Sequence, residues 1–277
     1  MAKKNQSNRL VAQQKAGHGA LSIFGPEAKK HDVMVGYVAM NVLKELEKLY
    51  PSLSFRYRTS ISKEEINNAL KKIDAELGQT LFVKDANIKP DGGLIEVKDD
   101  KENWRVVLVS EAKHQGKDIE NVTRGIKVGV NNNQDFMVAG NAIERAHKNI
   151  SEIANYMLNE GHFPYVLFLE GSNFITENVV VKRPNGETLT IRYDVGSLNR
   201  LDRLTAANYG MPINTNLCRN KFIESSGRMI MLQAASMFTQ GAGGSWSENE
   251  MSEIMLDVAK TSIKILASDL FNQLTTR

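Results

Sequence analysis

Residues 104–113 read Trp-Arg-Val-Val-Leu-Val-Ser-Glu-Ala-Lys, and this stretch decides how the rest of the chain is arranged. Its apolar run leaves neither face polar, which is typical of a strand in the middle of a covered sheet. Because side chains alternate along a strand, Glu111 and Lys113 point to the same side. The sequence therefore predicts a central strand over 104–110 that delivers an acid and a lysine together.

A second acid precedes this strand. Asp91 follows a proline and opens a Gly-Gly turn, which completes the pattern PD…ExK. A hard divalent cation takes oxygen ligands and leaves positions for water and a substrate phosphate. Asp91 and Glu111 supply such oxygens, and the Lys113 ammonium can orient or deprotonate a water. The pattern indicates a magnesium-dependent phosphodiesterase site; the alternative is a solvated strand end with an ordinary Glu/Lys pair.

The composition, 42% apolar and 24% charged over 277 residues, is that of an ordinary globular protein. No stretch approaches the roughly 20 apolar residues of a membrane span, and the polar N-terminus lacks a signal core, so we expect a cytoplasmic protein without membrane contact. The single cysteine, Cys218, excludes an internal disulfide and cysteine-rich zinc modules.

The net charge of +3 permits a polyanionic partner without requiring one. Residues 1–17 are basic and contain no acid, which predicts a mobile arm that could follow a phosphate backbone. A solvated tail without function is the alternative.

Helical and strand patterns alternate along the chain, so the expected class is α/β. Helices are expected over 33–50, over 143–157, from the capping box that begins at Ser62 to just before Gly78, and after Ser247. The expected strands are 81–83, 93–97, 104–110, 165–169 and 229–233, with a hairpin of 179–182 and 188–192. No repeat or linker divides the chain, and we expect one domain over 1–277.

Other chemistry finds no support in the sequence. His18, His31, His114, His147 and His162 have no zinc-ligand spacing. There is no glycine-rich phosphate loop after a strand and no serine in an elbow motif.

Long strings around the predicted site carry a family resemblance. They are Lys-Pro-Asp-Gly-Gly at 89–93, Ser-Glu-Ala-Lys-His-Gln-Gly-Lys-Asp at 110–118, Gly-Asn-Ala-Ile-Glu-Arg at 140–145, Phe-Pro-Tyr-Val-Leu-Phe-Leu-Glu-Gly-Ser-Asn at 163–173 and Leu-Asp-Arg-Leu-Thr-Ala-Ala-Asn-Tyr-Gly-Met-Pro at 201–212. With these strings the chain resembles the EcoRI family of type II restriction endonucleases over essentially its whole length.

The resemblance implies a single α/β domain with a central five-stranded mixed sheet flanked by helices, a PD-(D/E)xK nuclease core and arms that wrap DNA. It also implies a homodimer that cuts double-stranded DNA at the palindrome G-A-A-T-T-C, after G on each strand, and leaves 5′ phosphates. Twofold protein symmetry then matches twofold site symmetry. A cognate adenine methyltransferase is implied as a functional companion, not as a binding partner.

Residue roles follow from the same resemblance. Asp91, Glu111 and the carbonyl of Ala112 would hold Mg²⁺, and Lys113 would engage the attacking water and the scissile phosphate. The implied DNA contacts are Gln115, Lys117, Met137, Val138, Ala139, Gly140, Asn141, Ala142, Glu144, Arg145, Lys148, Arg200 and Arg203. Asn and Arg suit adenine and guanine edges, and small apolar residues suit thymine methyls.

Two departures from the family pattern bear on recognition. Val138 stands where the family has alanine, and 130–133 reads Val-Asn-Asn-Asn where the family has a basic pair. The first could shift the tolerance for bases, and the second would weaken nonspecific affinity and its salt dependence.

Two further functions compete with a restriction endonuclease. A related PD-(D/E)xK nuclease of altered specificity, or one that cuts by DNA structure, would give other fragments or none. A noncatalytic DNA-binding protein would keep the acids and lysine only as relics.

Overall fold

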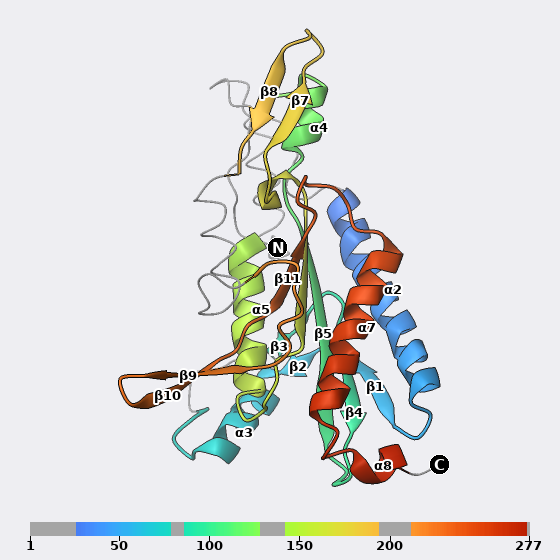
Figure 1. Cartoon of the computed structure of the whole chain (residues 1–277), viewed down its shortest axis with the longest axis vertical. Helices are drawn as coiled ribbons and strands as arrows, with labels where there is room; N and C mark the ends of the chain where they lie inside the picture. Colours follow the sequence, from blue (N-terminus) through green and yellow to red (C-terminus); the bar gives the residue numbers. More distant parts are fainter. Residues whose placement is uncertain (1–25, 79–85, 128–141, 194–211, 276–277) are drawn as a thin grey trace, which may run out of the picture.

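The computed structural model describes residues 26–78, 86–127, 142–193 and 212–275. Its centre is a five-stranded sheet in the order β1-β4-β5-β6-β11 (Figure 1). These strands are β1 (Phe55–Arg58), β4 (Leu94–Lys98), β5 (Trp104–His114), β6 (Tyr165–Glu170) and β11 (Ser236–Thr239). β1, β4 and β5 pair antiparallel, whereas β5, β6 and β11 pair parallel. The expected five-stranded mixed sheet is confirmed.

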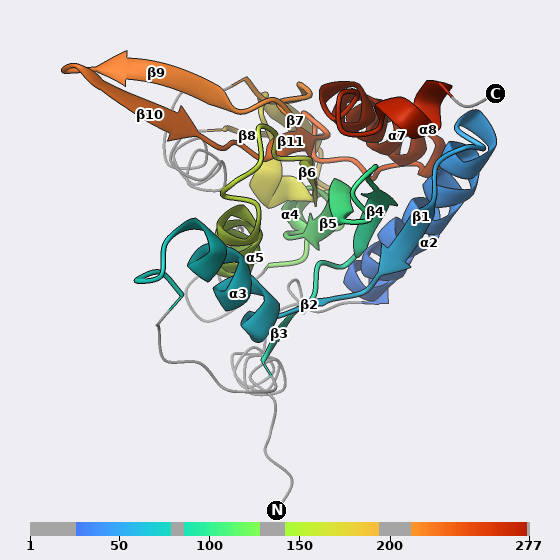
Figure 2. The ribbon, with the colours of Figure 1, turned by 90° about the horizontal axis from the view of Figure 1, so that it is seen from below.

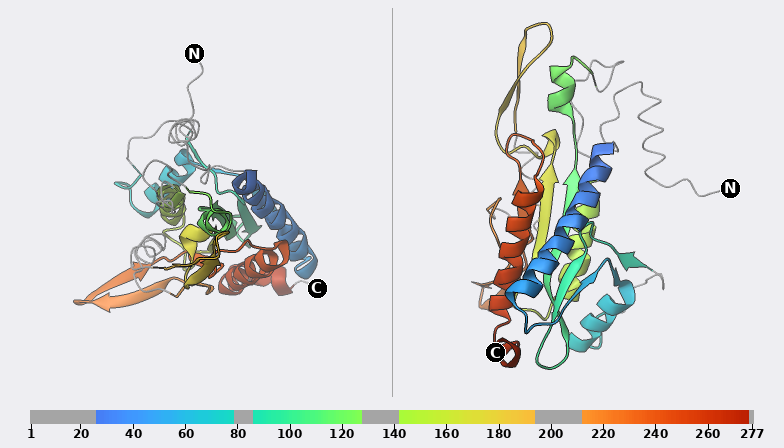
Figure 3. Two further views of the ribbon diagram at one scale, coloured as in Figure 1. Left: turned by 90° about the horizontal axis from the view of Figure 1, so that it is seen from above. Right: turned by 90° about the vertical axis from the view of Figure 1, so that its right-hand side faces the viewer.

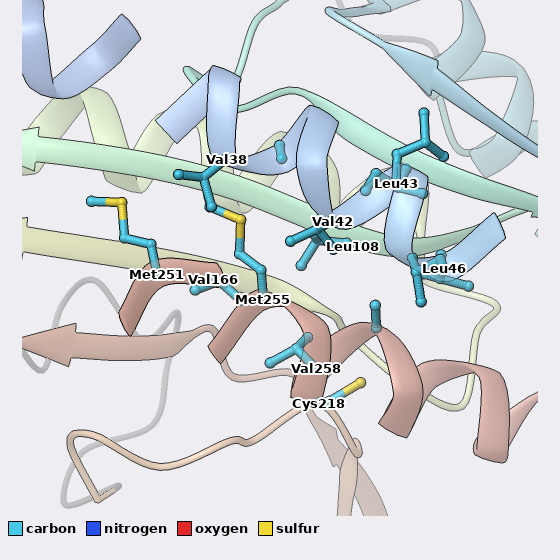
Figure 4. Packing of buried hydrophobic residues seen from close by; sticks show 14 of the residues in the cluster. Val38, Val42, Leu43, Leu46, Leu108, Val166, Cys218, Met251, Met255 and Val258 are labelled. Carbon is cyan, nitrogen blue, oxygen red and sulfur yellow. The ribbon is translucent and has the colours of Figure 1, made fainter. Parts of the chain in front are cut away.

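Helices α2 (Pro26–Leu49) and α7 (Glu248–Ile265) cover one face of the sheet (Figure 2). Their apolar side chains meet each other above β5 and β6 (Figure 4). Val38 and Val42 of α2 and Met255 and Val258 of α7 are at most 1% exposed. Each such side chain contributes roughly 1.5–3 kcal/mol through burial. This layer fixes the back of β5.

Helices α5 (Ala142–Tyr156) and α3 (Lys63–Ile73) lie on the opposite face. The buried stripe of α5 includes Ala146, Ile150 and Ile153, which recur at helical spacing and pack in a second core with strand residues. α3 begins at the expected capping box, in which Ser62 and Glu65 satisfy each other's backbone N–H groups. The result is a sheet between two helical layers.

A β-bulge in β5 sets which way its polar end faces. Ile95 pairs with Leu108 but Glu96 pairs with Val106, so Val107 is an extra residue. Val107 and Leu108 consequently both pack toward α2 and α7, and Val109 returns to the α5 side. Alternation from there carries Glu111 to the α5 side of the sheet.

Smaller elements extend from this body. The hairpin of β7 (Val179–Lys182) and β8 (Thr188–Ile191) rises beside α4 (Asp118–Thr123), and that of β9 (Lys221–Ser225) and β10 (Arg228–Leu232) projects sideways (Figures 1 and 3). The remaining elements are β2 (Ile61–Ser62), β3 (Asn87–Ile88), η1 (Ser172–Phe174) and α8 (Phe271–Thr275). In the described ranges, no helix is both long and apolar enough to cross a bilayer.

Several expected boundaries were wrong. α2 begins at Pro26, seven residues before position 33, α3 ends at Ile73 well before Gly78, and β5 continues four residues past Ser110 to His114. The outer strands β1 and β11, and the partner strand β9, were not predicted. The expected strand 81–83 and the basic arm 1–17 lie outside the described residues, and the single domain over 1–277 stays a prediction.

Candidate active site

The turn that carries Asp91 lies directly against β5. Gly92 N donates to the carbonyl of Ser110 at 2.9 Å, and Ser110 N donates to the carbonyl of Gly93 at 3.1 Å. A methyl group at Gly92 would lie 2.2 Å from Ser110 Oγ, and Gly93 has a φ of +69°, so both positions require glycine. The Gly-Gly pair therefore brings Asp91 beside Glu111, although the two are 20 positions apart.

Three oxygen atoms converge on the Lys113 ammonium group. Its Nζ lies 2.5 Å from Asp91 Oδ2, 2.6 Å from Glu111 Oε1 and 3.0 Å from the carbonyl oxygen of Ala112. Asp91, Glu111 and Lys113 are the residues of the PD…ExK pattern, and the Ala112 carbonyl is the further ligand that the family resemblance implies. The structure brings all four residues together at one point.

Glu111 is fully buried and is held from two further directions. Asn149 Nδ2 of α5 donates to Oε1 at 2.9 Å, and the Tyr165 hydroxyl of β6 donates to Oε2. A buried carboxylate needs such donors because it has lost its water. Neither residue was anticipated from the sequence. For Tyr165 the sequence does contain a signal, because it is the first residue of an apolar strand and a buried hydroxyl needs a hydrogen-bond partner.

Burial and mutual charge set the protonation states of this group. Burial raises the pKa of Glu111, and the Lys113 charge opposes that shift. For Lys113, burial acts to lower the pKa, but the Glu111 and Asp91 carboxylates outweigh it and raise the pKa above its usual range. Lys113 is therefore an ammonium at neutral pH and acts as a donor and counter-charge.

The donor set fits a hard divalent cation. Two carboxylate oxygens and one carbonyl oxygen already surround a single positive charge, and these are the ligand types that Mg²⁺ and Ca²⁺ take. The third oxygen belongs to the backbone and not to a side chain. Among the described residues, no cluster of three or more His, Cys, Asp or Glu side chains is placed to hold a metal ion. A site of this composition leaves coordination positions for water and phosphate.

A third acid lies near this group. Asp32 is an exposed residue of α2, yet packing around its carboxyl group and the neighbouring Asp91 charge raise its pKa to about 6. The α2 backbone does approach the turn, since a methyl group at Gly36 would lie 3.5 Å from the carbonyl oxygen of Asp91. Nothing in the sequence pattern connected Asp32 with the PD…ExK residues.

A buried polar cluster supports the end of β5 from the other side. His31 Nδ1 and His114 Nδ1 lie 2.8 and 3.2 Å from the two oxygens of Glu170, and Ser245 Oγ donates to Glu170 at 2.7 Å. These contacts connect α2, β5, β6 and the loop before α7. The sequence did not single out this cluster.

The expected DNA-contacting residues fall into four groups. Arg145 and Lys148 are exposed on α5, and Lys117 is partly exposed at the start of α4. Gln115 is fully buried, with no hydrogen-bond partner for its amide in the described part of the chain. Ala142 and Glu144 lie in the first turn of α5. Met137, Val138, Ala139, Gly140, Asn141, Arg200 and Arg203 lie outside the described residues.

Comparison with known proteins identifies the family. The family model described as restriction endonuclease EcoRI matches residues 17–273. The chain belongs to the EcoRI family of restriction endonucleases. It is 62% identical over 277 residues to the type II restriction enzyme EcoRI of Escherichia coli, with all of both chains covered. It is 51% identical over 267 residues to the type II restriction enzyme RsrI of Cereibacter sphaeroides, with 96% of each chain covered.

Membership of the EcoRI family settles the class of activity. The chain is a type II restriction enzyme, a site-specific deoxyribonuclease that depends on a divalent metal and binds double-stranded DNA, as expected from the resemblance. The alternative of a noncatalytic DNA-binding protein is not favoured.

Proposed function

We propose that this EcoRI-family enzyme is a homodimer that uses Mg²⁺ to cut duplex DNA at G-A-A-T-T-C, after G on each strand. The observation that carries the catalytic part is the convergence of Asp91, Glu111 and Ala112 oxygens on the Lys113 ammonium. Support for the specificity is the similarity to EcoRI along the whole chain.

In this proposal Asp91, Glu111 and the carbonyl of Ala112 hold Mg²⁺. At such a site the metal supplies charge that lowers the pKa of water and offsets charge on the phosphate. Tyr165 and Asn149 keep the Glu111 carboxylate oriented. If these oxygens held a divalent ion, they would no longer pair with the Lys113 ammonium. The ammonium could then turn to the attacking water and the scissile phosphate.

The β9–β10 hairpin favours a second copy of the chain as partner. Phe222 and Met229 are 58% and 69% exposed, and Ile223 and Ile230, which face each other across the hairpin, are more than 40% exposed. Apolar residues gathered on a projecting ribbon mark an interaction surface. A palindromic DNA site calls for a twofold dimer, in which each chain offers the same surface.

Digestion of a sequenced plasmid tests the enzymatic proposal. Discrete fragments with 5′ A-A-T-T overhangs are expected with Mg²⁺ and none with Ca²⁺ or a chelator. Discrete cuts at other sites would refute the specificity and would point to position 138. Fragments formed equally in chelator would refute the metal requirement.

Light scattering after gel filtration tests the dimer. The chain has a mass of 30.9 kDa, and a particle of twice that mass is expected. Replacing Phe222 and Met229 by serine is expected to produce the single-chain mass. A dimer that persists unchanged in this double variant would rule out the hairpin as the contact surface.

A further inference from the structure

We propose that Asn149 is a positioning residue through which DNA engagement by α5 controls the catalytic carboxylate of Glu111. The inference rests on the proposed function, in which α5 carries DNA-contacting residues. Its starting observation is one hydrogen bond, from Asn149 Nδ2 to Glu111 Oε1 at 2.9 Å. This bond joins the helix to β5 at the carboxylate that is proposed to hold the metal.

The position of Asn149 on α5 suits this role. It lies four residues after Arg145, so the two side chains are neighbours on one side of the helix, one turn apart. Arg145 and Lys148 are exposed, whereas Asn149 is half-buried between that surface and the core. The helix also packs through Ala146 and Ile150 against the sheet side that carries Glu111. A small shift of α5 as Arg145 engages a base edge therefore changes the distance from Asn149 to Glu111.

The Tyr165 hydroxyl, which also donates to Glu111, comes from the sheet and not from α5. Tyr165 belongs to β6, which pairs with β5 in the sheet, and Glu111 itself is opposite Leu167. The backbone of Tyr165 is therefore held by strand pairing, and its ring packs in the core beside Ile150 and Ile153 of α5. One carboxylate thus receives one donor from a sheet strand and one from the helix that carries Arg145, and the inference is that only the helix donor shifts when DNA is engaged.

The consequence concerns the cleavage step. Glu111 is fully buried, so loss of a donor costs more than it would in water and lets the carboxylate turn. When the bases at the site are wrong, α5 does not reach its position against the DNA, and the hydrogen bond from Asn149 to Glu111 lengthens. The enzyme then discriminates by cleaving slowly, in addition to binding weakly, because a carboxylate out of place by a fraction of an ångström holds a metal poorly.

The inference is tested with two variants, each of which removes one hydrogen bond from the same carboxylate. Asn149→Ala removes the donor from α5, and Tyr165→Phe removes the donor from the sheet. Single-turnover cleavage is measured on the cognate site and on single-base variants of it, with affinity measured separately in Ca²⁺. Asn155→Ala, an exposed change on the same helix, controls for the substitution itself.

Both variants should cut the cognate site about 10- to 100-fold more slowly, the worth of a hydrogen bond to a charged group. The cognate-to-variant rate ratio should fall about tenfold in Asn149→Ala, with unchanged affinity in Ca²⁺, and should stay constant in Tyr165→Phe. Asn149→Leu, which keeps the volume, should behave like Asn149→Ala. Ratios that fall equally in both single-bond variants, or in neither, would overturn the role of Asn149.

The design separates this inference from the proposed function. If the parent protein cuts at another sequence, the proposed specificity fails, and the same rate ratios measured at that sequence still decide the role of Asn149. If the parent cuts no DNA with Mg²⁺, both fail together.

Discussion

Lys113 Nζ lies 2.6 Å from Glu111 Oε1, and the two residues are two positions apart on β5. The ammonium therefore lies among the acidic oxygens and offsets part of the negative charge of Asp91 and Glu111. This pairing explains how a fully buried carboxylate is tolerated at the centre of the site.

Glu111→Gln should bind the DNA site and yet cut it at least about 10³-fold more slowly. A bound metal stabilises the transition state by several kcal/mol, and a neutral amide holds that metal less well than a carboxylate does. Glutamine keeps the shape of the side chain and can still accept from Tyr165. Gel-shift affinity in Ca²⁺ and single-turnover cleavage in Mg²⁺ are the two measurements. Equal cleavage by the variant and the parent would sink the assignment of Glu111.

Asp32→Asn should raise the Mg²⁺ concentration that gives half-maximal cleavage by about two- to fivefold, because it removes a negative charge close to Asp91 at a partly solvated position. Cleavage rate as a function of Mg²⁺ concentration gives the value. Glu47→Gln removes the same charge farther along α2, where the side chain is exposed, and should leave the Mg²⁺ dependence unchanged. A normal Mg²⁺ requirement in Asp32→Asn would remove Asp32 from the site.

Gly93→Ala should lower the free energy of unfolding by about 3 kcal/mol or more, because it adds a clash to the roughly 1–2 kcal/mol of left-handed strain. A methyl group at Gly93 would lie 2.5 Å from the carbonyl oxygen of Arg58. Gly186, in the β7–β8 turn, also has a positive φ but has nothing within 4 Å of the added carbon. Urea denaturation of Gly186→Ala should therefore show the strain alone, and equal losses in the two variants would refute the clash at Gly93.

The sequence predicted the central elements because their patterns are long and strong. β5 and β6 are apolar on both faces, and the capping box at Ser62 and the Asn-Gly hairpin turn are local signals that need no tertiary information. β1 reads Phe-Arg-Tyr-Arg and is half-buried throughout, so its arginines hide it from a hydrophobicity pattern. Arg56 of β1 pairs with buried Glu96 of β4 at 2.5 Å, so an arginine at this position is explained by a contact between two strands.

The chemistry of the site was readable, but its orientation was not. Alternation places Glu111 and Lys113 on one side of β5, yet the bulge at Val107 decides which side of the sheet that is. The bulge arises from pairing with β4, which a single strand does not encode. Asn149 and Tyr165 reach Glu111 only because of that orientation, so no spacing rule could have found them.

Glu170→Gln should reduce stability most at neutral pH and progressively less in acid. Burial acts to raise the pKa of Glu170, but hydrogen bonds from His114 and His31 outweigh it and hold the pKa well below its ordinary value of 4.5. A carboxylate with a depressed folded pKa contributes stability that is complete above 4.5 and is lost as pH falls through the folded value. At pH 7 the loss should be about 2–3 kcal/mol, the worth of a buried charged hydrogen bond.

Urea unfolding of parent and variant from pH 7 to pH 3 gives the difference at each pH, with exposed Glu253→Gln as the control. A difference that stays constant over this range, or grows in acid, would show that the Glu170 charge is not what stabilises the end of β5.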